Sequence, residues 1–181
     1  KSCVFHYEME FIHPFLDGNG RLGRLMISLY LASEGLLVRP ALYLSDYFER
    51  NKTAYVDHLM AVRQGNHMRD WLVFFLHGVE ETARASADVF RSILLIKERI
   101  ERDVLPRFSA RRQDNAHALM RHLYARPVVD VNMAAEILGT TTNTASALIV
   151  DMVTHGVLTE ITGQRRNRLF VFYEYIKLFR R

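Results

Sequence analysis

The sequence predicts a mainly helical protein that ends in a small α+β unit. Apolar residues recur at helical spacing along most of the 181 residues, and such periodicity indicates amphipathic helices. Two short segments near the end, 157–161 and 169–172, are instead typical of strands. Hydrophobic residues make up 49% of the chain and charged residues 24%, an ordinary balance for a chain with a packed core.

The first predicted helices lie before position 64. One covers Val4–Ile12, with Phe5, Met9 and Ile12 on one face. The next begins near Arg21 and ends at about Ser33, before Gly35. Its apolar residues make one stripe, which consists of Leu22, Leu25, Met26 and Leu29. Two shorter helices are predicted from about Ala41 to Phe48 or Glu49, and from about Thr53 to Arg63.

A long helix is predicted from Trp71 to Pro106. It is apolar nearly all round at first, as a central helix would be, and amphipathic and charged from Glu80 onward. Such a helix is typical of a bridge between domains or of a dimer surface, so a homodimer is one possible assembly. A polar, arginine-rich linker at 106–115 separates a first domain at 1–105 from a second at 116–181.

The last third of the chain predicts three helices and a hairpin. The first helix covers about Asp114–Ala125, and a second follows a cap at Asp130 or Asn132. The third covers about Thr142–His155. The two strands Val157–Ile161 and Leu169–Phe172 are joined by a loop that holds three arginines, Arg165, Arg166 and Arg168.

Composition and charge bear on nucleic-acid binding, on disulfide bonds and on membrane insertion. The net charge of +4 is too mild to argue for nucleic acid by itself. The single cysteine, Cys3, excludes an internal disulfide and fits a reducing compartment, so we expect a cytoplasmic protein. No apolar run approaches the roughly 20 residues that span a bilayer, so we expect no membrane partner.

The stretch His13–Arg24 gathers groups that bind phosphate and move a proton. Gly18 and Gly20 allow a turn whose N–H groups form a nest at the start of a helix, where the helix dipole also favours an anion. Arg21 and Arg24 are three residues apart and would share a helix face, from which both guanidinium groups could hold phosphate oxygens.

Three more side chains of this stretch have expected roles. Asp17 is a hard oxygen ligand for magnesium, which proteins usually hold with one or two carboxylates plus substrate phosphates. His13 can move a proton near neutral pH. Phe15 would anchor the loop by packing inward. Each feature alone is typical of a surface turn or a solvated helix face, but together and in this order they are much more specific.

The same stretch resembles the Fic motif, His-x-Phe-x-Asp/Glu-Gly-Asn-Gly-Arg-x-x-Arg, and matches it at every defined position. The resemblance implies a Fic-type helical domain that moves AMP from ATP to a Ser, Thr or Tyr hydroxyl of a target protein. It implies that His13 is the general base and that Asp17 holds Mg²⁺. The implied nucleotide- and phosphate-binding residues are Gly18, Asn19, Gly20, Arg21, Leu22, Gly23, Arg24 and Tyr55.

Tyr55 enters through a second, weaker similarity. Residues 44–55 resemble the segment that follows the motif in many Fic proteins, where a tyrosine helps to shape the adenine pocket. This chain has Ala54-Tyr55 where the family often has two tyrosines. The alternative is that Tyr55, Leu59 and Val62 form an ordinary core stripe.

The last third resembles a winged helix-turn-helix domain. Its third helix offers Thr, Asn and Ser residues but no Lys or Arg, so phosphate attraction would depend on the three loop arginines. Protein docking or dimerisation is therefore favoured over DNA binding. The competing function is a nucleotide-sensing winged-helix regulator that binds DNA or a protein partner, but a sensor does not need His13.

The resemblance covers only the back half of a Fic catalytic domain. We therefore expect the chain to be the carboxy-terminal part of a longer protein, with weak or no activity by itself. Many Fic proteins are inhibited by a glutamate that pairs with the second motif arginine, here Arg24. The pattern that carries this glutamate does not occur in the sequence, so a preceding segment or a partner protein would supply it.

Overall fold

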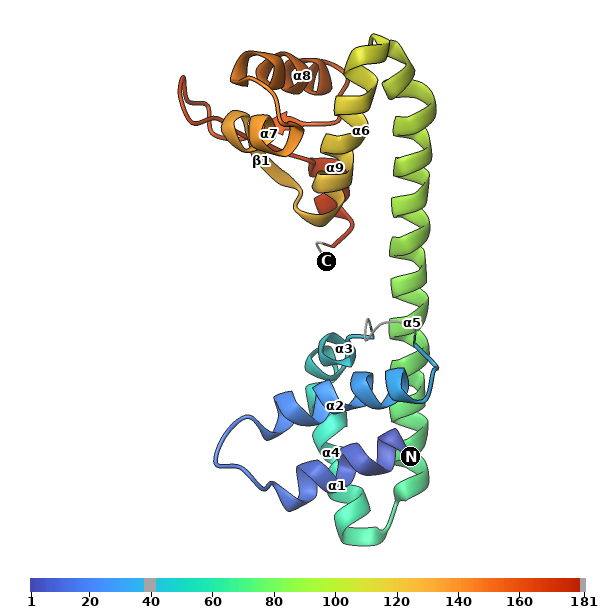
Figure 1. The fold of residues 1–181 in the computed structure, drawn as a ribbon. Coiled ribbons are helices and arrows are strands. Elements are labelled where there is room, and N and C mark those ends of the chain that lie inside the picture. The colour runs from blue at the N-terminus through green and yellow to red at the C-terminus, as the bar shows by residue number, and fades with distance from the viewer. Residues whose placement is uncertain (38–41, 180–181) are drawn as a thin grey trace. The chain divides into compact units, whose positions relative to one another are not determined.

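The computed structural model describes residues 1–37 and 42–179, and this part of the chain is mainly helical with a small three-stranded sheet (Figure 1). The predicted mainly α class is confirmed. The chain forms two compact units, Lys1–Asp88 and Val89–Arg181, and α5 (Met68–Arg99) contributes to both. Within the described ranges no helix is both long and apolar enough to cross a membrane.

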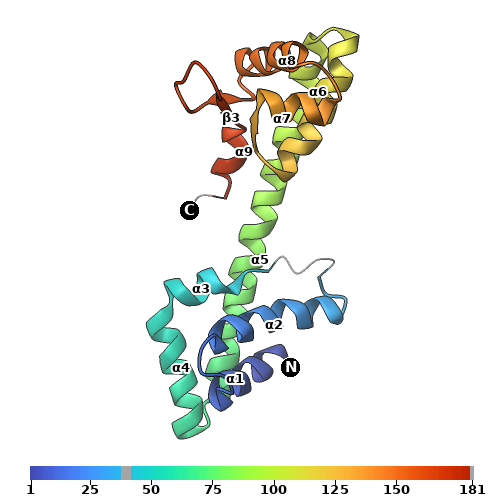
Figure 2. The ribbon, with the colours of Figure 1, turned by 60° about the vertical axis from the view of Figure 1, so that its left-hand side comes forward.

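The first unit contains α1 (Ser2–Ile12), α2 (Asn19–Ser33), α3 (Leu44–Arg50), α4 (Lys52–Gly65) and the beginning of α5. The helices α1 and α2 lie side by side (Figures 1 and 2). The core side chains come from all five helices and include Cys3, Ile27, Phe48, Val62, Trp71 and Phe75. The indole of Trp71 donates a hydrogen bond of 3.2 Å to the carbonyl of Cys3, which ties α5 to α1. The predicted helix start near Ala41 lies outside the described residues.

The predicted apolar face of α1 is wrong. The helix buries Ser2, Cys3, His6 and Tyr7, whereas Phe5 and Ile12 are exposed. The buried residues still follow helical spacing, but two of them are polar. A periodicity of apolar residues therefore selects the wrong side of this helix.

The predicted stripe of α2 is wrong for the same reason. Its buried positions include Gly23, Ile27 and Ser28, while Leu25 and Leu29 are exposed. A Cβ atom at Gly23 would lie 3.0 Å from Nδ1 of His6, closer than real Cβ contacts usually are. On this side of α2, side chains of α1 approach the helix closely, and the absence of a side chain at Gly23 permits that approach.

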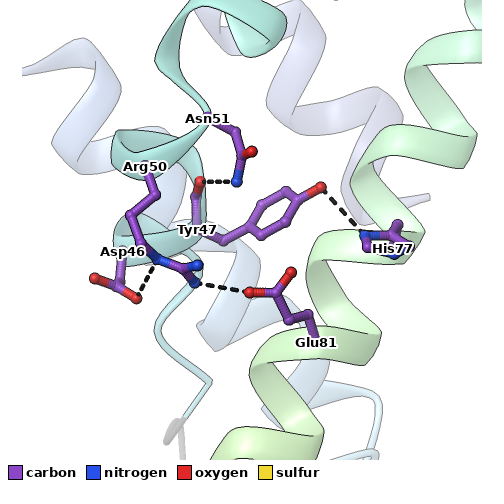
Figure 3. A network of polar contacts seen from close by, with 6 residues as sticks. All are labelled: Asp46, Tyr47, Arg50, Asn51, His77 and Glu81. Carbon is purple, nitrogen blue, oxygen red and sulfur yellow. Dashed lines mark hydrogen bonds and ion pairs between the residues drawn. The ribbon is translucent and has the colours of Figure 1, made fainter. Parts of the chain in front are cut away.

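A polar network attaches α3 to α5 within the first unit (Figure 3). Arg50 donates to Asp46 at 3.0 Å and to Glu81 at 2.8 Å. The hydroxyl of the buried Tyr47 is hydrogen bonded to Nδ1 of His77 at 3.4 Å. The sequence predicts the helices but not this contact, because its partners are about 30 residues apart.

The second unit begins on α5 and continues through a π-helical turn, η1 (Ile100–Val104), and a 3₁₀ turn, η2 (Leu105–Arg107), which contains Pro106. The helix α6 (Ala110–Ala125) begins inside the predicted linker, so residues 110–115 are helical. Then come β1 (Val128–Asp130), α7 (Val131–Leu138), α8 (Thr142–Thr154), β2 (Thr159–Glu160), β3 (Leu169–Val171) and α9 (Tyr173–Lys177). The division into a domain at 1–105, a linker and a domain at 116–181 stays a prediction.

The sheet of the second unit has the order β1-β3-β2, and both pairs are antiparallel. Strand β1 is absent from the sequence prediction, since three residues after Pro127 carry too little alternation to indicate a strand. The core behind the sheet includes the fully buried Leu119, Leu123, Val129, Met152 and Phe172. The element order contains the predicted three helices and hairpin, while the assignment as a winged helix stays a prediction.

Candidate functional site

The loop between α1 and α2 begins and ends in left-handed backbone conformations. His13 ends α1 with φ 48° and ψ 56°, and Gly18 precedes α2 with φ 84°. Glycine adopts this conformation freely, but histidine does so uncommonly, and such residues cluster at functional sites. No side chain caps the amino terminus of α2. Its first N–H groups have no partner within the helix, which makes the end of α2 a place for an anion.

Asn19 holds this loop in shape. Its side chain is buried, its Oδ1 accepts from the N–H of Phe15 at 3.0 Å, and its Nδ2 donates to the carbonyl of Phe15 at 2.6 Å. The prediction that the side chain of Phe15 packs inward is wrong, because that ring is exposed. The backbone of Phe15 is anchored instead, by the amide of a residue four positions later.

The imidazole of His13 has a defined orientation. Its Nδ1 is hydrogen bonded to the backbone carbonyl of Glu10 at 3.3 Å. A carbonyl can only accept, so Nδ1 carries the hydrogen and Nε2 keeps its lone pair. The side chain is exposed, which leaves Nε2 accessible to a hydroxyl.

The two motif arginines lie three residues apart on α2, as predicted, but they have different partners. Arg21 is 76% exposed and forms a 3.1 Å ion pair with Asp17, which is 91% exposed. Arg24 is half-buried, and its Nε donates to Oγ of Ser45 on α3 at 3.1 Å. Arg24 is thus connected to another helix, whereas Arg21 remains beside the loop in solvent.

A buried polar layer lies beneath the loop, and sequence reasoning missed it. His6 is fully buried, its Nε2 is hydrogen bonded to the hydroxyl of Tyr55 at 3.0 Å, and it lies 4.0 Å from Oε1 of Glu10. Burial lowers the pKa of His6 to about 4, so this ring is neutral near pH 7. Burial also raises the pKa of Tyr55 above its ordinary value. The available signal was the spacing of His6 and Glu10, which puts them on one helix face.

A pocket of about 270 Å³ lies against His13. Glu10 and Phe11 line it from α1, and Tyr55, Val56, Leu59 and Met60 line it from α4. Tyr55 and Leu59 also pack partly buried against the core of the first unit. Tyr55 therefore takes part both in the packing and in the wall of the pocket.

Among the described residues, no group of three or more His, Cys, Asp or Glu side chains could hold a metal ion. Asp17 is a single exposed carboxylate beside the loop. Its chemistry fits a magnesium ion that takes most of its ligands from phosphates and water.

Other predicted residues lie away from this loop. Leu22 and Gly23 lie on α2, where Gly23 packs against α1. Cys3 is buried, and burial raises its thiol pKa to about 12, so it is a poor nucleophile.

The second unit has a groove of about 660 Å³ lined by the three loop arginines, the start of α7 and the side of α8. Arg168 lies over the ring of Phe170, 5.1 Å from its centroid. The exposed residues at the start of α8 are Thr142, Asn143 and Thr144. DNA binding and protein docking by this unit both stay predictions.

Comparison with known proteins supports the resemblance of the amino-terminal part to the Fic family. Residues 1–31 match the model of the Fic/DOC family. The chain is 38% identical over 65 residues to a probable protein adenylyltransferase of Aquifex aeolicus. The matched segment covers 36% of this chain and 18% of that protein. It is 30% identical over 81 residues to the protein adenylyltransferase Fic of Aedes aegypti, and this match covers 45% of this chain and 15% of that protein.

A shorter match, 40% identical over 35 residues, is to the protein adenylyltransferase fic-1 of Caenorhabditis elegans and covers 19% of this chain and 7% of that protein. The chain therefore spans less than a fifth of the length of these relatives.

Proposed function

We propose that the chain carries the general base and the phosphate-binding loop of a protein adenylyltransferase, which moves AMP from ATP to a hydroxyl of a target protein. One observation carries the proposal: the accessible Nε2 of His13 and the uncapped amino terminus of α2 are brought together by one short, clamped loop. The names of the relatives support the same reaction class.

In this reaction His13 acts as the base. Its Nε2 takes the proton of the target hydroxyl, and the hydroxyl oxygen forms a bond to the α-phosphorus of ATP. The bond from that phosphorus to the bridging oxygen breaks, and pyrophosphate leaves with the electron pair. The hydrogen bond from Nδ1 to the Glu10 carbonyl would keep the ring oriented while Nε2 takes the proton.

The phosphates of ATP would lie at the amino terminus of α2. Gly18, Asn19 and Gly20 would offer backbone N–H groups, and Arg21 and Arg24 would bind phosphate oxygens. Asp17 would hold Mg²⁺ together with the phosphates, and the ion would neutralise phosphate charge. Developing charge is stabilised best by groups already in place, and the loop clamped by Asn19 meets that requirement.

The pocket beside His13 is the proposed place for the base of the nucleotide. A predominantly apolar wall with a few polar groups is typical of such sites, and this pocket combines Phe11, Val56 and Leu59 with Tyr55. The hydrogen bond to His6 would hold the ring of Tyr55 in this wall, where Tyr55 would orient the base of the nucleotide.

The test is incubation of the full-length protein with a cell extract, magnesium and ATP labelled at either the α- or the γ-phosphate. We expect label on protein from α-labelled ATP but not from γ-labelled ATP, since AMP retains only the α-phosphate. His13→Ala should lower the rate by about 10²–10⁴-fold, because the base is lost.

The matched control is His67→Ala, which removes an exposed histidine that lines no part of this loop. It should label proteins at the unaltered rate. Equal labelling by the His13→Ala variant would contradict the assignment of His13 as the base. Label transferred from the γ-position would contradict adenylyl transfer.

A further inference from the structure

The charged ends of Glu10 and Arg24 both lie close to Gly20, in the first turn of α2. A Cβ atom at Gly20 would lie 3.1 Å from Nη1 of Arg24 and 3.5 Å from Oε1 of Glu10. The carboxylate and the guanidinium thus approach the same point on α2 from two different helices. A side chain at this position would crowd the guanidinium, so the glycine leaves room for both charged groups.

Glu10 is a buried carboxylate without an ordinary partner. Its side chain is 14% exposed, and its Oε1 is fully buried with no hydrogen-bond partner among the described residues. Burying an anion is costly unless a positive charge compensates it. His6 is 4.0 Å away but cannot supply that charge near pH 7, because burial keeps its pKa at about 4. Burial raises the pKa of Glu10, and the charge of Arg24 is the largest influence that opposes this shift, followed by that of His13.

A second motif glycine makes room for the same carboxylate. A Cβ atom at Gly23 would lie 3.0 Å from Oε1 of Glu10. Gly20 and Gly23 therefore both face Glu10 across the contact between α1 and α2. The absence of side chains at these two positions leaves room for the carboxylate against α2, on the side where the guanidinium of Arg24 also lies.

Arg24 is constrained from two sides. Its Nε donates to Ser45 on α3, and the Glu10 carboxylate lies at its other end. Arg21 has only the exposed Asp17 beside it. An arginine whose rotamer is fixed before the ligand arrives loses less conformational entropy on binding, and so contributes more to affinity.

We propose that Glu10 is a positioning residue for Arg24, whose guanidinium it holds over Gly20 in the place where Arg24 receives a phosphate of the nucleotide. The inference rests on the proposed function, because it takes Arg24 as a phosphate ligand. Glu10 itself does not touch the nucleotide phosphates. It acts through the orientation of Arg24.

The test combines Glu10→Gln with a matched control on the same helix, Glu8→Gln, whose carboxylate is exposed. Calorimetric titration with ATP should show about ten-fold weaker binding for Glu10→Gln and no change for Glu8→Gln. In an Arg24→Ala background, Glu10→Gln should have no further effect, because the group that it positions is gone. The thermal midpoint of Glu10→Gln should not fall, since a buried charge is replaced by a neutral group of the same shape.

A second readout does not depend on the nucleotide. The Nε–H signal of Arg24 in nitrogen-resolved NMR, assigned by its loss in Arg24→Lys, should be sharp in the unaltered protein and in Glu8→Gln, and shifted or broadened in Glu10→Gln. An unchanged signal, tighter ATP binding, or an equal loss in the Arg24→Ala background would overturn the inference. A shifted signal in a protein that binds no ATP would support the positioning role and contradict the proposed function.

Discussion

The charged groups around the loop come from residues outside the motif as well as from the motif itself. Arg21 and Arg24 have the same side chain and lie on the same helix, yet one is mostly exposed and the other is held by Ser45 beside Glu10. His13 and Asn19 are fixed by backbone partners within a few residues. Local contacts therefore shape the loop, while contacts with residues distant in the sequence determine the orientation of Arg24.

The neutral, buried His6 predicts a pH-dependent stability for the first unit. Its pKa is about 4 in the folded state and near 6.5 in the unfolded state, so the unfolded state binds a proton first as the pH falls. The stabilisation is fully present above pH 6.5 and is lost between about pH 6.5 and 4, with a size of roughly 3 kcal/mol. Urea unfolding at pH 7 and pH 5 checks this.

His6→Gln should show a smaller loss of unfolding free energy from pH 7 to pH 5 than the unaltered protein does. The control His67→Gln changes an exposed ring and should keep the full loss. A pH dependence that is the same in all three proteins would show that His6 is not the group responsible.

At the scale of elements, the contact between helices is decided by glycines and by polar clamps. Gly23 lets α1 approach α2, and Arg50 joins α3 to α5 through Asp46 and Glu81. On α5, Gly78 faces the ring of Tyr47, whose Cδ1 would lie only 2.5 Å from a Cβ atom at position 78. Close packing between α3 and α5 therefore requires the absence of a side chain there.

Gly78→Ala should destabilise the first unit by up to about 2 kcal/mol. Alanine favours the helix by roughly 1 kcal/mol over glycine, but overpacking costs about 1–3 kcal/mol, and the buried Tyr47 ring is held by His77. Urea unfolding measures the net effect. In a Tyr47→Ala background the same change should become stabilising, because the opposing ring is gone; a stabilising effect with Tyr47 in place would refute the prediction.

At the scale of the whole molecule, the described residues form two separate hydrophobic cores. One gathers around Trp71 and Phe75, and the other around Leu119 and Leu123. The chain has a single tryptophan, and it is fully buried in the first core. Its fluorescence therefore reports on the first unit alone, whereas circular dichroism reports on all helices.

Leu123→Ala should separate the unfolding transition of the second unit from that of the first. Removing a fully buried leucine costs about 2–5 kcal/mol, so part of the circular dichroism transition should move to lower urea. The fluorescence transition of Trp71 should stay in place. Ile27→Ala, in the first core, is the complementary control and should move the fluorescence transition. Parallel movement of both signals in Leu123→Ala would mean that the cores unfold as one.

The sequence by itself determined the mainly helical class and most helix positions, because turns, caps and helical periodicity are local properties. The roles of the residues in His13–Arg24 stay predictions. The sequence also indicated the hairpin that β2 and β3 form, but it missed β1, whose three residues acquire a strand only by pairing with β3.

The tertiary structure decided which helix faces are buried and what lies behind the loop. His6, Glu10, Arg24, Ser45 and Tyr55 come from four helices, and the contacts of Arg24 with Ser45 and of His6 with Tyr55 join residues 21 and 49 positions apart. Periodicity favoured the exposed Phe5 and Leu25 over the buried His6 and Gly23. Apolarity predicts burial only where apolar side chains fill the interface, and here the polar side chains of His6 and Glu10 pack against glycines of α2.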